Sequence, residues 1–203
     1  MAEIMRSNGE PSKTQRTRAR LVAATRDEIA EAGSFTAERV ANRAGTSVAT
    51  FYIHLPTKDD ALTATFGEVM DELVRVVEAS LTRERLELQG LEVLSREFVD
   101  ASLAFFGERS PIFRLALARM PEHRPLREVY RAHEAKAFSL YAGFIESGQS
   151  AGLLRAGDAT VLTRSLLVLS QGLNNPLALG LEAEDSLRDE LARLVIALLA
   201  PQS

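Results

Sequence analysis

The chain has 203 residues, of which 46% are hydrophobic and 26% are charged, a composition typical of a globular protein. The absence of cysteine excludes disulfide frameworks, thiolate zinc sites and cysteine nucleophiles. The formal net charge of −4, taken for the whole chain, argues against nucleic-acid binding. We expect a cytoplasmic protein, because no apolar run reaches the roughly 20 residues that span a bilayer and residues 1–20 lack the apolar core of a signal peptide.

The charge is unevenly distributed along the chain. Residues 1–60 carry nine Lys or Arg against eight Asp or Glu, a net charge of +1, whereas residues 61–203 carry fifteen against twenty, a net charge of −5. A basic run without an intervening acid lies near the N-terminus: Lys13, Arg16, Arg18 and Arg20. Whole-chain charge is therefore a poor guide to what the N-terminal part can bind.

Glycines and hydroxyl side chains mark the ends of four expected helices in the first third of the chain. After a disordered tail (residues 1–13), we expect helices at about residues 14–32, 37–44, 47–54 and 58–81. Gly33 and Gly45 end the first two, while Thr36 and Thr57 supply N-cap hydroxyls to the second and fourth. Either Thr46 or Ser47 caps the third.

The remainder of the chain shows helical spacing of apolar residues, without a competing strand pattern. We expect helices at about residues 91–106, 111–120, 126–147, 158–177 and 186–199. A charged link over residues 82–87 precedes them, Pro111 separates the first two, and Gly148, Gly152 and Gly157 predict a loop. The sequence thus predicts an all-α chain of about nine helices.

Residues 36–54 have the form of a helix-turn-helix. The first short helix has a small apolar inner face, and Phe51 fits the inner face of the second. The outward residues of the second helix form a small surface rich in hydrogen-bond donors: Ser47, Ala49, Thr50, Tyr52 and His54. Such a surface suits phosphates and base edges. Generic helical hairpins share the turn chemistry, so the residues alone leave both interpretations open.

The stretch TAERVANRAGTSVATFYIHLPTKDDAL, residues 36–62, resembles the N-terminal DNA-binding domain of the TetR family of repressors. The main departure is Leu55, where the family usually has Phe. The specific match covers about residues 17–66, and beyond it only the helical pattern and length agree. The resemblance implies a three-helix helix-turn-helix DNA-binding domain over residues 14–60 and an effector-binding and dimerisation domain over residues 61–203.

The resemblance also implies roles for individual side chains in DNA binding. Thr36, Tyr52 and Lys58 would meet phosphates, and the start of the recognition helix would reach bases. Arg16, Arg18 and Arg20 are placed for an arm that reaches the minor groove or phosphates, with a solvated tail as the alternative. The full set of implied DNA-contact residues is Arg18, Arg20, Thr36, Arg39, Thr46, Ser47, Val48, Ala49, Thr50, Tyr52, His54 and Lys58.

For the second domain, the resemblance implies an effector cavity and a dimer interface. Aromatic side chains and polar residues within apolar runs are the candidates for the cavity: Phe66, Met70, Phe98, Phe105, Phe113, Tyr130, Phe138, Tyr141, Leu167, Gln171 and Asn174. Apolar stripes of the last two helices are the candidates for the interface: Leu162, Leu166, Leu169, Leu173, Leu187, Leu191, Leu194, Val195 and Leu198. Ordinary core packing is the alternative for every aromatic and stripe residue named.

Together these observations predict a ligand-responsive transcriptional regulator, most simply a repressor. Its expected partners are a palindromic double-stranded DNA operator, a small hydrophobic effector and a second copy of the chain, with no membrane partner. A helix-turn-helix regulator without an effector is the alternative. An enzyme is not expected, because no nucleophile motif or phosphate loop is present. We expect no cofactor and no metal, since His123 and His133 are expected on the surface without a companion ligand.

Overall fold

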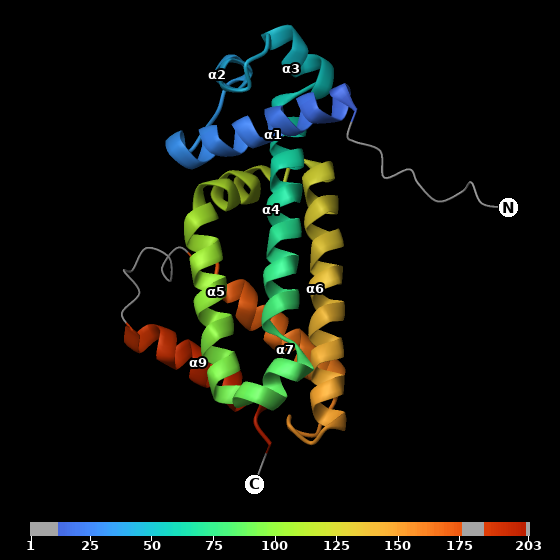
Figure 1. Ribbon diagram of the computed structural model, residues 1–203, viewed down its shortest axis with the longest axis vertical. Helices are drawn as coiled ribbons and strands as arrows, with labels where there is room; N and C mark the ends of the chain where they lie inside the picture. The colour runs from blue at the N-terminus through green and yellow to red at the C-terminus, as the bar shows by residue number, and fades with distance from the viewer. Residues whose placement is uncertain (1–11, 176–184, 202–203) are drawn as a thin grey trace, which may run out of the picture. The chain divides into compact units, whose positions relative to one another are not determined.

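The computed structural model describes residues 12–175 and 185–201 (Figure 1). Within these ranges the regular structure consists of eight helices and no strand, so the predicted all-α fold class is confirmed. Contacts along the chain divide it into two compact units, with the boundary between Thr65 and Phe66. The predicted tail up to residue 11 lies outside the described residues, as do residues 176 and 177 of the helix predicted to end near residue 177. That helix ends earlier than predicted, at Gly172.

The first unit contains three helices and the beginning of a fourth. They are α1 (Lys13–Ala32), α2 (Ala37–Arg43), α3 (Val48–His54) and the first turns of α4 (Lys58–Ser80). The expected caps are present: the Thr36 hydroxyl accepts a hydrogen bond from the Arg39 N–H at 3.3 Å, and Gly33 adopts a left-handed conformation with φ of 67°. These local signals fix where each short helix begins and ends.

Large apolar side chains from each of these helices close the core of the first unit. Leu21 and Ile29 from α1, Val40 from α2, and Phe51 with the following Leu55 are all between 0 and 1% exposed. Leu55 therefore fills the buried position that the family usually gives to Phe. This packing holds the two short helices against α1.

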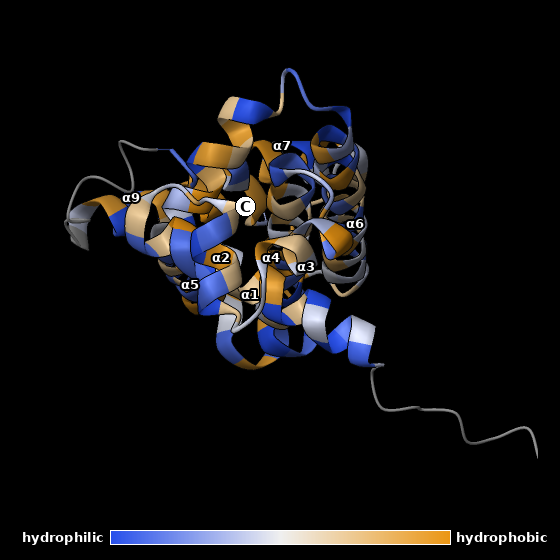
Figure 2. Ribbon diagram, turned by 90° about the horizontal axis from the view of Figure 1, so that it is seen from above, coloured by the Kyte–Doolittle hydropathy of each residue, from blue (hydrophilic) through white to orange (hydrophobic). Residues whose placement is uncertain are grey.

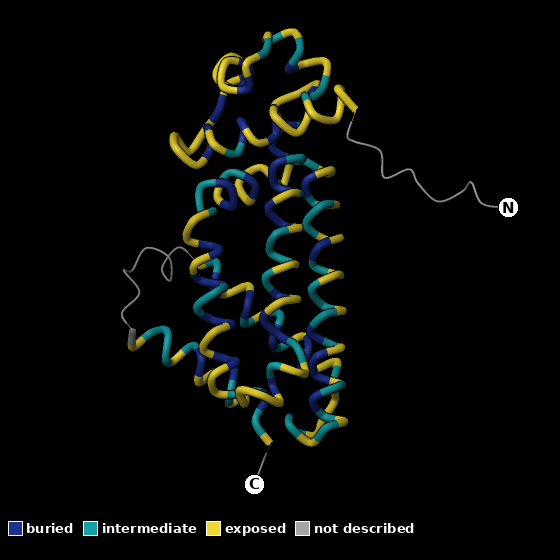
Figure 3. The backbone as a smooth tube through the Cα atoms, viewed as in Figure 1, coloured by how far each residue is buried: buried dark blue, intermediate teal, exposed yellow. Residues whose placement is uncertain are grey.

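The second unit is built from the rest of α4 with α5 (Arg83–Arg119), α6 (Arg124–Ser150), α7 (Ala159–Gly172) and α9 (Asp185–Leu199). In Figure 1, α4, α5 and α6 run lengthwise, and α7 and α9 lie obliquely to them. Figure 2 shows that hydrophobic and hydrophilic residues alternate along individual helices. Burial alternates in the same way in Figure 3, as expected of helices with one face in a core.

Helix α5 corrects two predictions. The expected charged link over residues 82–87 is wrong, because the Thr82 hydroxyl caps the helix by accepting from the Arg85 N–H at 3.2 Å. The expected separation at Pro111 is also wrong, because Pro111 lies inside α5, which is one reason for eight described helices rather than nine. Gly90, with φ of 78° and ψ of 164°, interrupts the helical backbone, so α5 consists of two helical segments joined at a kink. A glycine adopts this conformation without a steric penalty.

The loop predicted from three glycines begins later than expected. Gly148 lies inside α6, where its missing side chain leaves room for Leu154: a Cβ there would be 2.5 Å from Leu154 Cδ1. The turn follows at Gly152, with φ of 71°. The Asp158 carboxylate then caps α7 by accepting a hydrogen bond from the Thr160 N–H. Among the described residues, no helix is long and apolar enough to cross a membrane.

Candidate nucleic-acid interface and effector cavity

The turn between α2 and α3 is held by hydrogen bonds at both helix ends. Gly45 has a φ of 60°, and the Thr46 N–H donates to the Ala41 carbonyl at 2.9 Å. The Ser47 side chain caps α3 by accepting from the Thr50 N–H at 3.1 Å, and the two hydroxyl oxygens lie 2.9 Å apart. These bonds fix the angle at which α3 leaves α2, as a helix-turn-helix requires.

Helix α3 buries one face and exposes the other. Phe51 is fully buried, whereas the neighbouring Tyr52 is 45% exposed and Ile53 is 76% exposed. Tyr52 packs edge-on against Phe51, with ring centroids 5.1 Å apart, so the buried ring of Phe51 restricts the position of the Tyr52 ring. Ala49 is exposed as well. The outer face of α3 therefore presents hydroxyls, an aromatic ring and an apolar side chain to solvent.

Lys58, at the start of α4, is held in a defined position by its neighbours. The Thr57 hydroxyl accepts from the Asp60 N–H at 3.0 Å, and the Asp60 carboxylate accepts from the Thr57 N–H at 3.0 Å, which forms a capping box. Lys58 Nζ lies 5.2 Å from the centroid of the Phe35 ring, within range of a cation–π interaction. Lys58 remains exposed and available to a phosphate.

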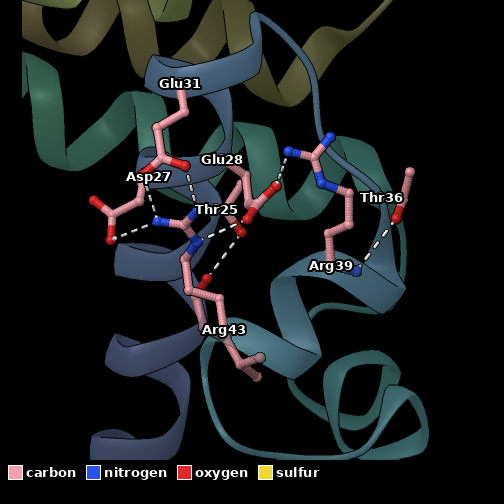
Figure 4. A network of polar contacts seen from close by, with 8 residues as sticks. Thr25, Asp27, Glu28, Glu31, Thr36, Arg39 and Arg43 are labelled. Carbon is pink, nitrogen blue, oxygen red and sulfur yellow. Dashed lines mark hydrogen bonds and ion pairs between the residues drawn. The ribbon is translucent and has the colours of Figure 1, made fainter.

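A network of ion pairs joins α1 to α2 (Figure 4). Glu28 is buried, and its carboxylate lies 2.5 Å from Arg39 Nη2 and 2.7 Å from Arg43 Nε. Arg43 also donates to Glu31, and this hydrogen bond lowers the pKa of Glu31. A buried carboxylate needs such partners, since an unpaired charge would be costly in the core. The network thus holds Arg39 at the surface of α2.

The basic run before residue 21 is helical. The Ser12 side chain and Gln15 form a capping box that starts α1 ahead of the run, so Arg16, Arg18 and Arg20 lie on a helix. The alternative of a disordered tail is therefore wrong for these arginines, and their contact with DNA stays a prediction. Arg20 donates to the carbonyl of Ala44 at the end of α2.

A cavity of about 280 Å³ lies within the second unit. Four helices contribute to its wall: Met70, Leu73, Val74 and Val77 from α4; Phe106, Phe113 and Leu117 from α5; Tyr130, His133, Glu134, Ala137 and Tyr141 from α6; Leu167, Ser170, Gln171 and Gly172 from α7, followed by Asn174 and Asn175. The wall is mostly apolar and aromatic, with a few polar groups from α6 and the end of α7. This composition is typical of small-molecule sites.

His133 is buried, which corrects the expectation that it lies on the surface. Its Nδ1 is 2.7 Å from the Val129 carbonyl and its Nε2 is 2.9 Å from Asp71 Oδ1. Both partners are acceptors, so a ring nitrogen that carries a hydrogen donates to the partner beside it. The bond from His133 lowers the pKa of Asp71, as the charged form of the carboxyl is favoured. The pair links α6 to α4.

Two tyrosines of the wall are perturbed by burial. Burial raises the pKa of Tyr141 to about 12. The pKa of Tyr130 is also raised, mainly by burial and to a smaller extent by the negative charge of Glu134. Glu134 Oε1 accepts a hydrogen bond from Gln171 Nε2 at 2.8 Å, which joins α6 to α7 at the cavity.

No protein-family model matches the sequence, and no curated protein matches it either. Solved structures do match. A TetR transcription regulator from Haloarcula marismortui aligns with a TM-score of 0.71 at 20% identity, over 90% of this chain and 96% of that one. The chain has the TetR-family fold. A SmeT–triclosan complex aligns with a TM-score of 0.66 at 20% identity, over 92% of each chain.

A third match to the TetR-family fold is a candidate transcriptional regulator from Saccharomonospora viridis, solved in complex with choline. It aligns with a TM-score of 0.68 at 22% identity, over 92% of this chain and 99% of that one. These likenesses cover both units of the chain and establish its fold.

In this TetR-family fold, the predicted cavity residues fall into two groups. Seven line the cavity: Met70, Phe113, Tyr130, Tyr141, Leu167, Gln171 and Asn174. Phe66, Phe98, Phe105 and Phe138 are not in its wall. The first three are buried behind lining rings: Phe66 packs edge-on against Phe113 at 5.5 Å, and Phe98 against Tyr141 at 6.3 Å. They support the wall, as core packing predicts.

The sequence reasoning missed His133 and Glu134 in the cavity and Ile53 on α3. A helical period could have found them. His133 and Glu134 lie one turn after Tyr130 and two turns before Tyr141, so they share the lining face of α6. Ile53 lies about 200° around the helix from the buried Phe51, which places it on the outer face.

The predicted dimer residues are divided between core and surface. Leu162, Leu166, Leu173 and Val195 are between 0 and 5% exposed and belong to the core of the single chain, which corrects their assignment to an interface. Leu169, Leu187, Leu191 and Leu198 are half-buried. Leu194 is 54% exposed, and the α7 residues Val161 and Val168, which were not predicted, are 56% and 68% exposed.

Proposed function

We propose that this protein is a ligand-responsive DNA-binding transcriptional regulator that acts as a homodimer. The observation that carries the proposal is the outer face of α3, where a fixed helix-turn-helix presents Tyr52, Ile53 and small polar side chains to solvent. The TetR-family fold supports it, since regulators share that fold at similar length.

The proposed DNA contacts divide into two classes. Tyr52, Thr36 and Lys58 would bind phosphates and set the register of the protein on the duplex. Val48, Ala49 and Thr50, with Ser47 and Thr46 at the cap, would face base edges in the major groove. Ile53 is added to this set, because an apolar side chain can contact the methyl group of thymine. His54 and Arg18 complete the predicted backbone contacts.

Two of the proposed contacts have competing partners within the protein. Arg39 would have to leave or share the Glu28 carboxylate to reach DNA. Arg20 would have to release the carbonyl of Ala44. We therefore propose that Arg20 chiefly holds α2 and its turn in place, and that Arg39 contributes less than Lys58 to affinity.

The cavity supports an effector role and weighs against a regulator without one. The triclosan and choline complexes are of proteins with this fold. Helix α4 carries both Lys58 and the lining residues Met70 to Val77. A ligand that displaces α4 would thus reposition a proposed DNA contact. By linkage, DNA would weaken ligand binding by the same factor.

Dimerisation is supported by the exposed apolar side chains of the last two helices. Val161, Val168 and Leu194 would cover one another across a two-fold axis. Two recognition helices would then read the two halves of a palindrome. Replacing Val168 by Asp is expected to give a monomer in light scattering; a dimer that persists in this variant would place the interface elsewhere.

A mobility-shift assay with the DNA upstream of the protein's own coding sequence tests the proposal. We expect a retarded complex that a scrambled duplex of equal length does not compete away. If the scrambled duplex competes equally, the protein is not a sequence-specific regulator of that DNA.

A further inference from the structure

We infer that the cavity selects a small organic cation, with Glu134 as its counter-ion and the aromatic rings of the wall around its body. This inference rests on the proposed function only in treating the cavity as the effector site. It goes further by naming the charge of the ligand.

The charges of the wall point to this class. No lining residue is Lys or Arg, and the ionisable groups of opposite sign are His133 and Glu134. Both ring nitrogens of His133 lie within hydrogen-bond distance of acceptors inside the protein, with Nε2 2.9 Å from Asp71 Oδ1. Glu134, in contrast, meets the neutral amide of Gln171. The Glu134 carboxylate is therefore a negative charge in the wall that no lysine or arginine of the wall neutralises.

Glu134 retains capacity to bind a ligand. A carboxylate can accept about four hydrogen bonds, and Gln171 uses one of its oxygens, Oε1. The field of Glu134 reaches the wall, since it contributes to raising the pKa of Tyr130. A cation placed between the carboxylate and Tyr130 would be attracted by both the charge and the ring.

The aromatic rings favour the same class. Phe106, Phe113, Tyr130 and Tyr141 all line the cavity. The face of an aromatic ring attracts a cation within about 6 Å, and quaternary ammonium groups are commonly held by several rings. An acidic ligand would instead meet the Glu134 carboxylate, with neither Lys nor Arg among the lining residues to offset the repulsion. A neutral ligand would remove water from the carboxylate without replacing its hydrogen bonds, which is unfavourable.

A matched pair of compounds tests the inference on DNA-free protein. Phenyltrimethylammonium and tert-butylbenzene have the same shape and differ in charge, and both suit a cavity of about 280 Å³. We expect calorimetry to give at least roughly tenfold tighter binding of the cation, as a charged contact of this strength requires. Equal or tighter binding of tert-butylbenzene, or no detectable binding of the cation, would overturn the inference.

Two variants assign the preference to Glu134. Glu134→Gln is expected to remove the preference for the cation while the neutral compound binds as before. Glu146→Gln, an exposed position on the same helix and outside the cavity, should change neither affinity. A preference that survives in Glu134→Gln would refute the assigned counter-ion. Binding of the cation without release of DNA would refute the effector role and leave the ligand class intact.

Discussion

The two units of the chain place their functional side chains in opposite ways. In the first unit, the candidate DNA contacts other than Arg18 and Arg20 lie within one stretch, residues 36–58, around a compact core. In the second unit, the candidate ligand contacts come from four helices and face inward. A short sequence motif can encode a surface site, because each helix needs only to expose one face. An enclosed cavity depends on packing between segments far apart in sequence.

Adjacent residues of α3 give the largest expected difference. Phe51→Ala should destabilise the protein by about 3–5 kcal/mol, because it empties a fully buried site. Tyr52→Ala should change stability by less than about 1 kcal/mol, since Tyr52 is 45% exposed, yet it should weaken DNA binding. Urea denaturation together with mobility shifts measures both. If Tyr52→Ala unfolds the protein as readily as Phe51→Ala, Tyr52 is a core residue instead.

The same contrast explains what could be predicted. The helix ends at Thr36, Gly33 and Thr57 follow from local hydrogen bonding and backbone conformation, so the sequence alone locates them. Which aromatic side chains line the cavity depends on long-range packing. Phe66 and Phe113 are in contact, and nothing in the local pattern says which one faces the open space.

The positions of several ionisable residues do not follow from local sequence, for a related reason. His133 has no local signal of burial, since its partner Asp71 is 62 residues away in the sequence. Arg20 and Arg18 carry the same charge and lie close together in the sequence. Arg20 nevertheless donates a hydrogen bond to the carbonyl of Ala44, 24 residues away, which the local sequence does not predict. Such roles are set by tertiary structure, which a motif does not contain.

The cavity should make stability depend on alkaline pH. Tyr141 has a raised pKa of about 12 in the folded protein, so the folded state keeps a proton that the unfolded state loses near its ordinary pKa. Stability is therefore complete below pH 10 and declines between about pH 10 and 12, by an amount on the order of 2–3 kcal/mol. Denaturation of wild type and Tyr141→Phe over this range measures it. An equal decline in both proteins would exclude Tyr141 as the source.

Two glycines of α6 test how tightly the second unit is packed. Gly148→Ala should cost about 1–3 kcal/mol, because the new Cβ would lie 2.5 Å from Leu154 Cδ1 and Leu154 is buried. Gly143→Ala meets nothing within 4 Å and should stabilise the helix by up to about 1 kcal/mol. Thermal melts of the two variants compare the sites directly. Equal melting temperatures would mean that Leu154 moves aside without cost.

The salt dependence of DNA binding tests the central claim, that the first unit binds DNA through the face formed by α3 and the start of α4. We predict that Lys58→Ala weakens binding about tenfold and reduces the slope of log affinity against log salt by about 1, as loss of one phosphate contact requires. Lys136→Ala, an exposed lysine on α6, should change neither. Wild-type affinity and slope in Lys58→Ala would contradict the proposed interface.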